Sequence, residues 1–197
     1  MSSSSQVRWG ALGALLAAAG WTVSGIIAFA FGVAPFGPVG SLSWYLIESS
    51  DALGVAGMVV LLVGLYARQV PRYGWLGTVG FALAFVGTAS YFLSYPIYIL
   101  TADGSWAILD ILEYAALIGL FAGFPPLGVA TFRARVLPRW CGVLIAALPA
   151  VFFVIFVLVD YSGAARALFG PYWLALGYAL WSHRGEPIQP ARPARVS

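Results

Sequence analysis

Two carboxylates, Asp110 and Glu113, lie near the start of a long apolar run that extends from Trp106 to Arg139. Residues three apart on an α-helix share a face, so both side chains are expected to point the same way. At a rise of about 1.5 Å per residue, they lie roughly 7 and 12 Å from a helix start at Ser105. Acids at membrane depth are costly, so this pair is a candidate proton carrier, cation site or general acid.

The preceding apolar run supplies a candidate wall for this site. A short loop forces the two runs against each other, and hydroxyl groups recur at spacings of three, four and three residues. That spacing places them on one face of a helix. The hydroxyl-bearing residues are Thr88, Tyr91, Tyr95 and Tyr98.

Other runs contribute the remaining candidates. Tyr114 lies beside Glu113, and Asp51 opens the second apolar run. Arg166 is expected to pair either with Asp160, six residues before it, or with an acid of the fourth run. The predicted ligand-binding residues are therefore Asp110, Glu113, Tyr114, Tyr91, Tyr95, Asp51 and Arg166, and the candidates for catalysis are Asp110 and Glu113.

A purely structural interpretation explains the same residues. Tyrosine hydroxyls are common where helices meet the membrane surface. The acids would then be solvated near a helix end, or bonded to Arg166 or to backbone of the fifth run. Under this interpretation the polar residues form a packing network and bind nothing.

The composition defines the class of protein. The chain of 197 residues is 61% hydrophobic and 9% charged, whereas soluble domains carry about 25% charged residues. An apolar excess of this size has to face lipid, which makes the lipid bilayer the first expected partner. One cysteine and one histidine exclude an intramolecular disulfide and a multi-histidine metal centre. No metal, cofactor or nucleic-acid motif is predicted.

The apolar runs predict an all-α fold, a polytopic bundle of six transmembrane helices. The segment 33–50 is rich in proline and glycine, so Ser43–Glu48 is expected to lie in the interface instead of spanning. Pro96 is expected to bend the third helix, and the pair at 125–126 to kink the fourth. Three segments follow: a disordered N-terminus (1–7), a membrane domain (8–182) and a disordered basic tail (183–197). The helices are expected at 9–31, 51–67, 73–93 or as far as 100, 106–133, 140–159 and 167–181.

The charges orient this bundle. With the N-terminus inside, nine of the ten arginines fall at cytoplasmic ends, and only Arg166 falls outside. Six of the seven acids fall in the outer half, and only Glu186 lies inside. The positive-inside rule therefore predicts a multi-pass protein of the bacterial cytoplasmic (inner) membrane with both termini in the cytoplasm.

Two cytoplasmic turns share a sequence pattern. Ala67–Tyr73 (ARQVPRY) matches Ala134–Trp140 (ARVLPRW) at a constant offset of 67 residues. The match predicts a duplicated hairpin, with helices 2–3 repeated as helices 4–5. Convergent interface chemistry is the alternative, because arginine and aromatic side chains both suit the headgroup layer.

The runs ARVLPRWCGVL (Ala134–Leu144) and LGYALWS (Leu176–Ser182) resemble small multi-pass membrane proteins of GC-rich bacteria. The resemblance extends over most of the chain. It implies a six-helix integral membrane fold without a known activity, and it assigns no catalytic residue.

Three functions remain open at this stage. The favoured one is binding of a small cationic or amphipathic (lipidic) ligand, or of protons, in an outward-facing acidic and aromatic pocket. The second is an intramembrane enzyme that acts on an isoprenoid or lipid by general acid catalysis. The third is a structural or assembly subunit of a membrane complex. Six short helices enclose little volume, so transport would favour a homo-oligomer.

Overall fold

Helices account for all regular structure in the part of the chain described by the computed structural model, residues 3–31, 39–69, 72–101, 107–158 and 163–182. The all-α prediction is therefore confirmed. A π-helical turn, η2, joins α4 to α5, and a 3₁₀ turn, η3, precedes α7. The elements are α1 (Ser3–Ala30), α2 (Leu42–Gln69), α3 (Gly74–Thr101), α4 (Ala107–Ile118), η2 (Gly119–Gly123), α5 (Phe124–Ala134), α6 (Arg139–Leu158), η3 (Gly163–Leu168) and α7 (Phe169–Ser182).

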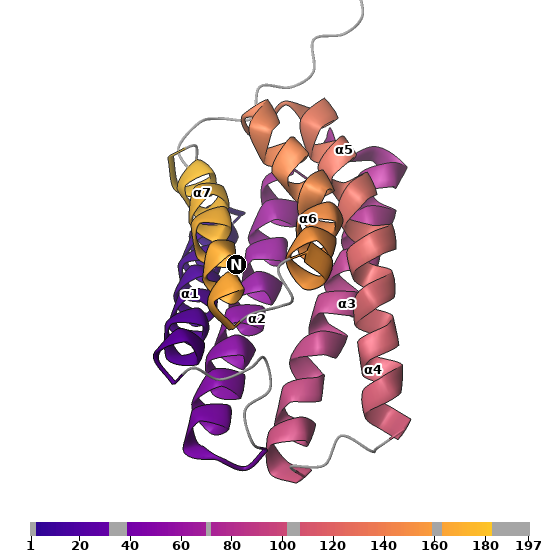
Figure 1. Cartoon of the computed structure of the whole chain (residues 1–197). Helices are drawn as coiled ribbons and strands as arrows, with labels where there is room; N and C mark the ends of the chain where they lie inside the picture. Colours follow the sequence, from indigo (N-terminus) through magenta and orange to yellow (C-terminus); the bar gives the residue numbers. More distant parts are fainter. Residues whose placement is uncertain (1–2, 32–38, 70–71, 102–106, 159–162, 183–197) are drawn as a thin grey trace, which may run out of the picture.

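Elements α4, η2 and α5 form one continuous helical segment, and so do η3 and α7. We call each such segment a rod, and the described residues form six rods, as predicted. Successive rods run in opposite directions (Figure 1). Four of them are long and apolar enough to cross a membrane: Ser5–Ala30, Leu42–Gln69, Gly74–Thr101 and Ala107–Ala134. A helix of 28 residues is about 42 Å long, and the hydrocarbon core of a bilayer is about 30 Å thick.

The start of α2 differs from the prediction. The helix begins nine residues before Asp51, so Ser43–Glu48 forms its first turns and does not lie separately in the interface. The last helix-breaking residue is Gly40, which has a positive φ of 83°. Ser41 then caps the helix, because its hydroxyl accepts a hydrogen bond from the backbone N–H of Trp44 at 3.2 Å. The predicted helix start at Asp51 was wrong because it counted the prolines and glycines of the loop against the residues that follow them.

Two prolines, Pro125 and Pro126, were predicted to kink the fourth rod. They occupy the first turn of α5, where a missing backbone N–H costs least. The turn directly before them is π-helical, and the N–H of Phe124 donates to the carbonyl of Gly119, five residues back. A π turn absorbs the backbone change that proline imposes, so the helix continues to Ala134.

The two ends of the predicted membrane domain also need adjustment. α1 begins at Ser3, so residues 3–7 are helical although the sequence predicted disorder there. The last helix was expected at 167–181, and the structure gives a 3₁₀ turn followed by α7. The predicted tail, residues 183–197, lies outside the described residues. The proposed hairpin repeat stays a prediction.

The rods pack in two groups that meet mainly through α2 and α3. The first group is α1, α2, η3 and α7, and the second is α3, α6 and the rod of α4, η2 and α5. Within each group glycines let backbones touch. A Cβ atom at Gly13 of α1 would lie 2.7 Å from the carbonyl oxygen of Gly57 in α2. One at Gly87 of α3 would lie 2.5 Å from the Cα of Gly119 in η2.

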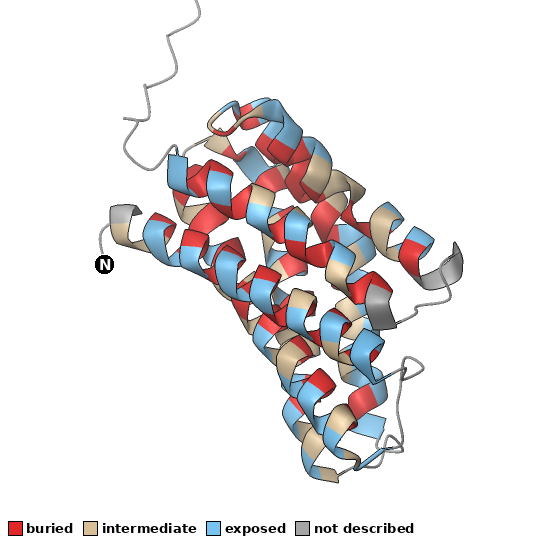
Figure 2. Ribbon diagram, turned by 60° about the vertical axis from the view of Figure 1, so that its left-hand side comes forward, coloured by how far each residue is buried: buried red, intermediate tan, exposed pale blue. Residues whose placement is uncertain are grey.

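The outer surface of the bundle is apolar. Buried and exposed positions alternate along the rods, as they do when one helix face packs inward (Figure 2). Large apolar side chains lie on the exposed faces, among them Phe29, Trp75 and Leu100, with exposed fractions of 77%, 78% and 84%. In water such a surface would aggregate, whereas lipid accommodates it.

Close packing between α1 and α2 gives a direct test of the first helix group. We expect Gly13→Val to lower the free energy of unfolding by about 2 kcal/mol, because the added atoms overlap the α2 backbone. Ala19→Val on the same helix is the matched control, since Ala19 is exposed and the substitution should change stability by less than about 0.5 kcal/mol. Unfolding in mixed detergent micelles measures both. Equal stabilities for the two variants would contradict this packing.

Candidate functional site

A cavity of about 690 Å³ lies between the two helix groups. Each of the six rods contributes side chains to its wall, so the whole bundle has to fold before the cavity exists. The lining residues are Trp21 of α1; Glu48, Asp51 and Met58 of α2; Gly87, Thr88, Tyr91, Ser94, Tyr95 and Tyr98 of α3; Leu109, Glu113, Ala116 and Leu117 of α4; Leu120 and Phe121 of η2; Phe124 of α5; Leu148, Phe152 and Phe153 of α6; Arg166 of η3; and Phe169 and Trp173 of α7.

A buried ion pair lies at one end of the cavity. The Nη1 atom of Arg166 donates a hydrogen bond to Oδ2 of Asp51 at 2.6 Å, and the two side chains are only 2% and 3% exposed. The same guanidinium nitrogen lies 3.4 Å from the hydroxyl oxygen of Ser24, which accepts a weaker bond. This pair joins η3 to α2 and to α1. Neither predicted partner of Arg166 is the one found here: the ion pair is with Asp51, and Asp160 lies outside the described residues.

Glu48 adds a second carboxylate from α2. It lies one turn before Asp51 on the same helix face, is 6% exposed and lines the cavity. With Glu113 from α4, three carboxylates and one guanidinium border this end. The charged end of the cavity, defined by Glu48, Asp51, Glu113 and Arg166, therefore carries net negative charge when all four groups are ionised.

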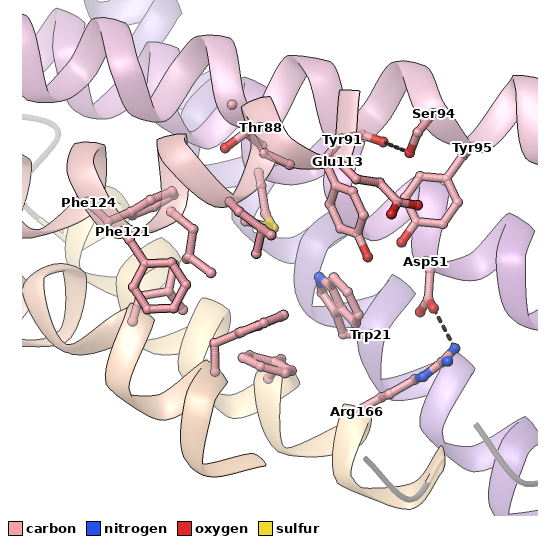
Figure 3. Close-up of a pocket in the computed structure, with 18 of the residues that line it drawn as sticks. Trp21, Asp51, Thr88, Tyr91, Ser94, Tyr95, Glu113, Phe121, Phe124 and Arg166 are labelled. Atoms are coloured by element: carbon pink, nitrogen blue, oxygen red, sulfur yellow. Dashed lines mark hydrogen bonds and ion pairs between the residues drawn. The ribbon is translucent and has the colours of Figure 1, made fainter. Parts of the chain in front are cut away.

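Five of the seven predicted ligand-binding residues line the cavity. Glu113, Tyr91 and Tyr95 lie on the side that faces the other two, the ion pair of Asp51 and Arg166 (Figure 3). The rings of Tyr91 and Tyr95 lie 5.1 Å apart between centroids, at an angle of 56°. Helix α3 can present both rings because they are four residues apart and so project from the same face.

The other two predicted residues lie elsewhere. Asp110 and Tyr114 are exposed and do not line the cavity. On α4 the inward face carries Leu109 and Glu113, which are four residues apart. Asp110 lies about 100° around the helix from Leu109 and faces the surroundings of the bundle. Asp110 and Glu113 do lie on the same helix, three residues apart, as predicted, but only Glu113 lines the cavity.

Aromatic and aliphatic side chains form the rest of the wall. Phe121 and Phe124 extend the cavity away from the charged end (Figure 3), and Phe152 of α6 also lines it. Ring contacts join the walls: Trp21 lies 5.4 Å from Phe169, and Phe152 lies 6.5 Å from the same ring, between centroids. The cavity is thus divided into a charged end and an apolar chamber, which we define by Phe121, Phe124, Leu148, Phe152 and Phe169.

The sequence did not identify three important residues: Trp21, Ser24 and Glu48. Glu48 repeats the signal that singled out the fourth run, because it precedes Asp51 by three residues just as Asp110 precedes Glu113. It was missed because Ser43–Glu48 was assigned to the interface. Trp21 and Ser24 lie in the part of α1 after Arg8, which is apolar and carries no charge, so no local pattern marks them.

Among the described residues, no three or more His, Cys, Asp or Glu side chains group closely enough to hold a metal ion. The carboxylates of the charged end are spread over α2 and α4. No known protein family, curated protein or solved structure matches this chain.

Loss of one partner of the buried ion pair should be costly. We expect Arg166→Met to lower the free energy of unfolding by about 3 kcal/mol or more, because it leaves the Asp51 carboxylate without its guanidinium. The double variant Asp51→Leu, Arg166→Met should recover much of that loss, since no uncompensated charge remains. Unfolding in mixed micelles measures the four proteins of this cycle. Additive losses would contradict a direct pairing.

Proposed function

We propose that this chain is a binding protein, not an enzyme, and that the cavity holds an amphipathic ligand with a cationic head. The observation that carries the proposal is the division of one cavity into a charged end and an apolar chamber. The head would lie among Glu48, Asp51 and Glu113, and the apolar part would lie in the chamber. Both parts of such a ligand find a matching wall.

Electrostatics favour a cation at the charged end. Arg166 engages Asp51 through a short hydrogen bond, and Glu48 and Glu113 add two further carboxylates to the same end of the cavity. Tyr91 and Tyr95 add ring faces, which attract ammonium groups through the negative potential of their π electrons. An anionic head would meet more like charge than opposite charge and would be excluded.

Size favours a molecule over a bare ion or proton. Pockets for small organic ligands have volumes of about 300–1,000 Å³, and this cavity has about 690 Å³. A proton or metal ion would occupy only the charged end and would leave the apolar chamber empty. The presence of the chamber therefore favours an organic ligand.

The location that we propose with this function is the cytoplasmic membrane of a bacterium, in agreement with the resemblance noted above. Arg8 at the start of α1, Arg68 at the end of α2 and Arg139 at the start of α6 lie at the same end of the bundle, because successive rods alternate in direction. The positive-inside rule assigns that end to the cytoplasm. The chain would cross the membrane several times with both termini inside, and the charged end of the cavity would lie in the outer half.

The chain offers a matched pair of variants for the test. We expect Glu113→Gln to bind a fluorescent dodecyltrimethylammonium probe about tenfold more weakly than the unaltered protein, a loss of about 1.4 kcal/mol. Asp110→Asn removes a carboxylate from the same helix, one turn away, but at an exposed position outside the cavity. It should bind the probe normally.

The probe is measured by equilibrium binding to protein in lipid nanodiscs, with dodecyl sulfate as the anionic comparison. Equal affinities of the two variants, or preference for dodecyl sulfate, would contradict the proposal. An enzyme would instead convert a lipid, so a membrane lipid composition that changes when the protein is present would favour general acid catalysis.

A further inference from the structure

We infer that the ligand is a membrane-resident amphiphile and that it reaches the cavity sideways from the bilayer, between α4–η2 and α6. This inference rests on the proposed function and names its substrate class and route. The ligand would carry an amine or quaternary ammonium head and a hydrocarbon tail. Four observations support the route: the exposure of the rim, the closure of the other seams, the depth of the opening and the place of Glu113.

The rim of the opening consists of residues that line the cavity and are also exposed to the surroundings. Leu117 of α4, Phe121 of η2 and Phe153 of α6 line the cavity, yet their exposed fractions are 43%, 49% and 55%. Asp51 and Arg166, on the opposite wall, are only 2% and 1% exposed. The cavity therefore opens on the side of α4, η2 and α6.

Contacts close the boundaries between the other pairs of neighbouring helices that surround the cavity. Gly87 and Gly119 bring α3 against η2, and the rings of Trp44 and Tyr98 join α2 to α3 at 5.3 Å between centroids. Between α6 and α7, the hydroxyl of Tyr172 donates a hydrogen bond to the carbonyl of Leu144 at 2.6 Å. Among the described residues, α4 approaches α6 less closely than the helices of any of these pairs approach each other.

Helices α5 and α6 are in contact near Gly128, and the opening lies further along the same two rods, beside η2. Gly128 of α5 lies against Ala146 of α6, where a Cβ on the glycine would approach the alanine side chain to 2.6 Å. Phe121 and Phe153 lie seven residues beyond these positions, so they are about 10 Å further along each helix. The tight contact thus defines where the seam closes, toward the arginine-rich end.

The depth of the opening suits a lipid tail. Phe121 lies near the middle of the rod Ala107–Ala134, about 20 Å from either end. At this depth the surroundings are hydrocarbon, which a water-soluble cation would have to cross at a high cost. The tail of an amphiphile already lies there.

Glu113 lies where the head of the same amphiphile would pass. It is exposed and also lines the cavity, and it follows the start of α4 at Ala107 by six residues, about 9 Å. The headgroup layer is closest to this end of the rod. A cationic head could therefore contact Glu113 at the rim before it moves inward to Glu48 and Asp51, while its tail slides past Phe121 and Phe153.

A removable block of the opening tests this route. In a Cys141→Ala background, Phe153→Cys is modified with a benzyl methanethiosulfonate, and binding of the dodecyltrimethylammonium probe from vesicles is followed in time. We expect the bulky group to slow association at least about tenfold, and a reductant that removes it to restore the rate. Leu117→Cys serves as a second blocking position, for the case in which unmodified Phe153→Cys does not bind.

Val143→Cys is the matched control. Val143 lies on the same helix with the same exposed fraction, 55%, as Phe153, but does not line the cavity. Modification there should leave the association rate unchanged. Equal rates for the modified Phe153→Cys and Val143→Cys proteins would overturn sideways access, while probe binding that still depends on Glu113 would leave the proposed function intact. Absence of probe binding to every unmodified protein would overturn both.

Discussion

The buried ion pair of Asp51 and Arg166 is the constraint around which the first helix group is arranged. Removing either charge from water costs several kcal/mol, so each group needs the other at short range. The 2.6 Å hydrogen bond supplies this contact and fixes η3 against α2. Ser24 joins α1 to the same guanidinium. Three segments distant in sequence therefore converge at one end of the cavity, and the start of α7 is held there with them.

The cavity follows from two kinds of packing that act in different places. Within each helix group, glycine pairs such as Gly87 and Gly119 bring backbones into contact and leave no space. Between the groups, large rings face each other, as in the pairs Phe152–Phe169 and Tyr66–Phe81. Rings hold the groups further apart than glycines would, and the charged pair fills only one end. A divided cavity results from this distribution of small, aromatic and charged residues.

The sequence predicted where the helices lie more accurately than it predicted which side of each helix faces the cavity. Long apolar runs have to be helical in lipid because every backbone polar group needs a partner there, and the six rods follow from that requirement. The meeting of Glu113 with Tyr91 and Tyr95 could be predicted because a short loop places α3 against α4. The exposure of Asp110 outside the cavity could not be predicted. A spacing of three residues places two side chains on similar sides of a helix, but it does not say which of them faces the neighbouring helices.

Long-range partners were beyond the sequence for a related reason. Arg166 had several acids within reach of a plausible topology, and the choice of Asp51 depends on how α7 lies against α2. Glu48 was not predicted as a site residue because the start of α2 was placed too late in the sequence, although Ser41 is a typical N-cap residue. Such errors arise where a loop composition and a capping residue compete to define one boundary.

The central claim is that one ligand lies with its cationic head at the charged end and its tail in the apolar chamber. A crystal structure in lipid, with an alkyltrimethylammonium probe whose tail ends in bromine, tests it most directly, since anomalous scattering locates the bromine. We expect the bromine among Phe121, Phe124 and Phe152, and density for the head beside Glu48 and Asp51. Bromine found only on the lipid-facing surface, or a head located in the aromatic chamber, would contradict the account.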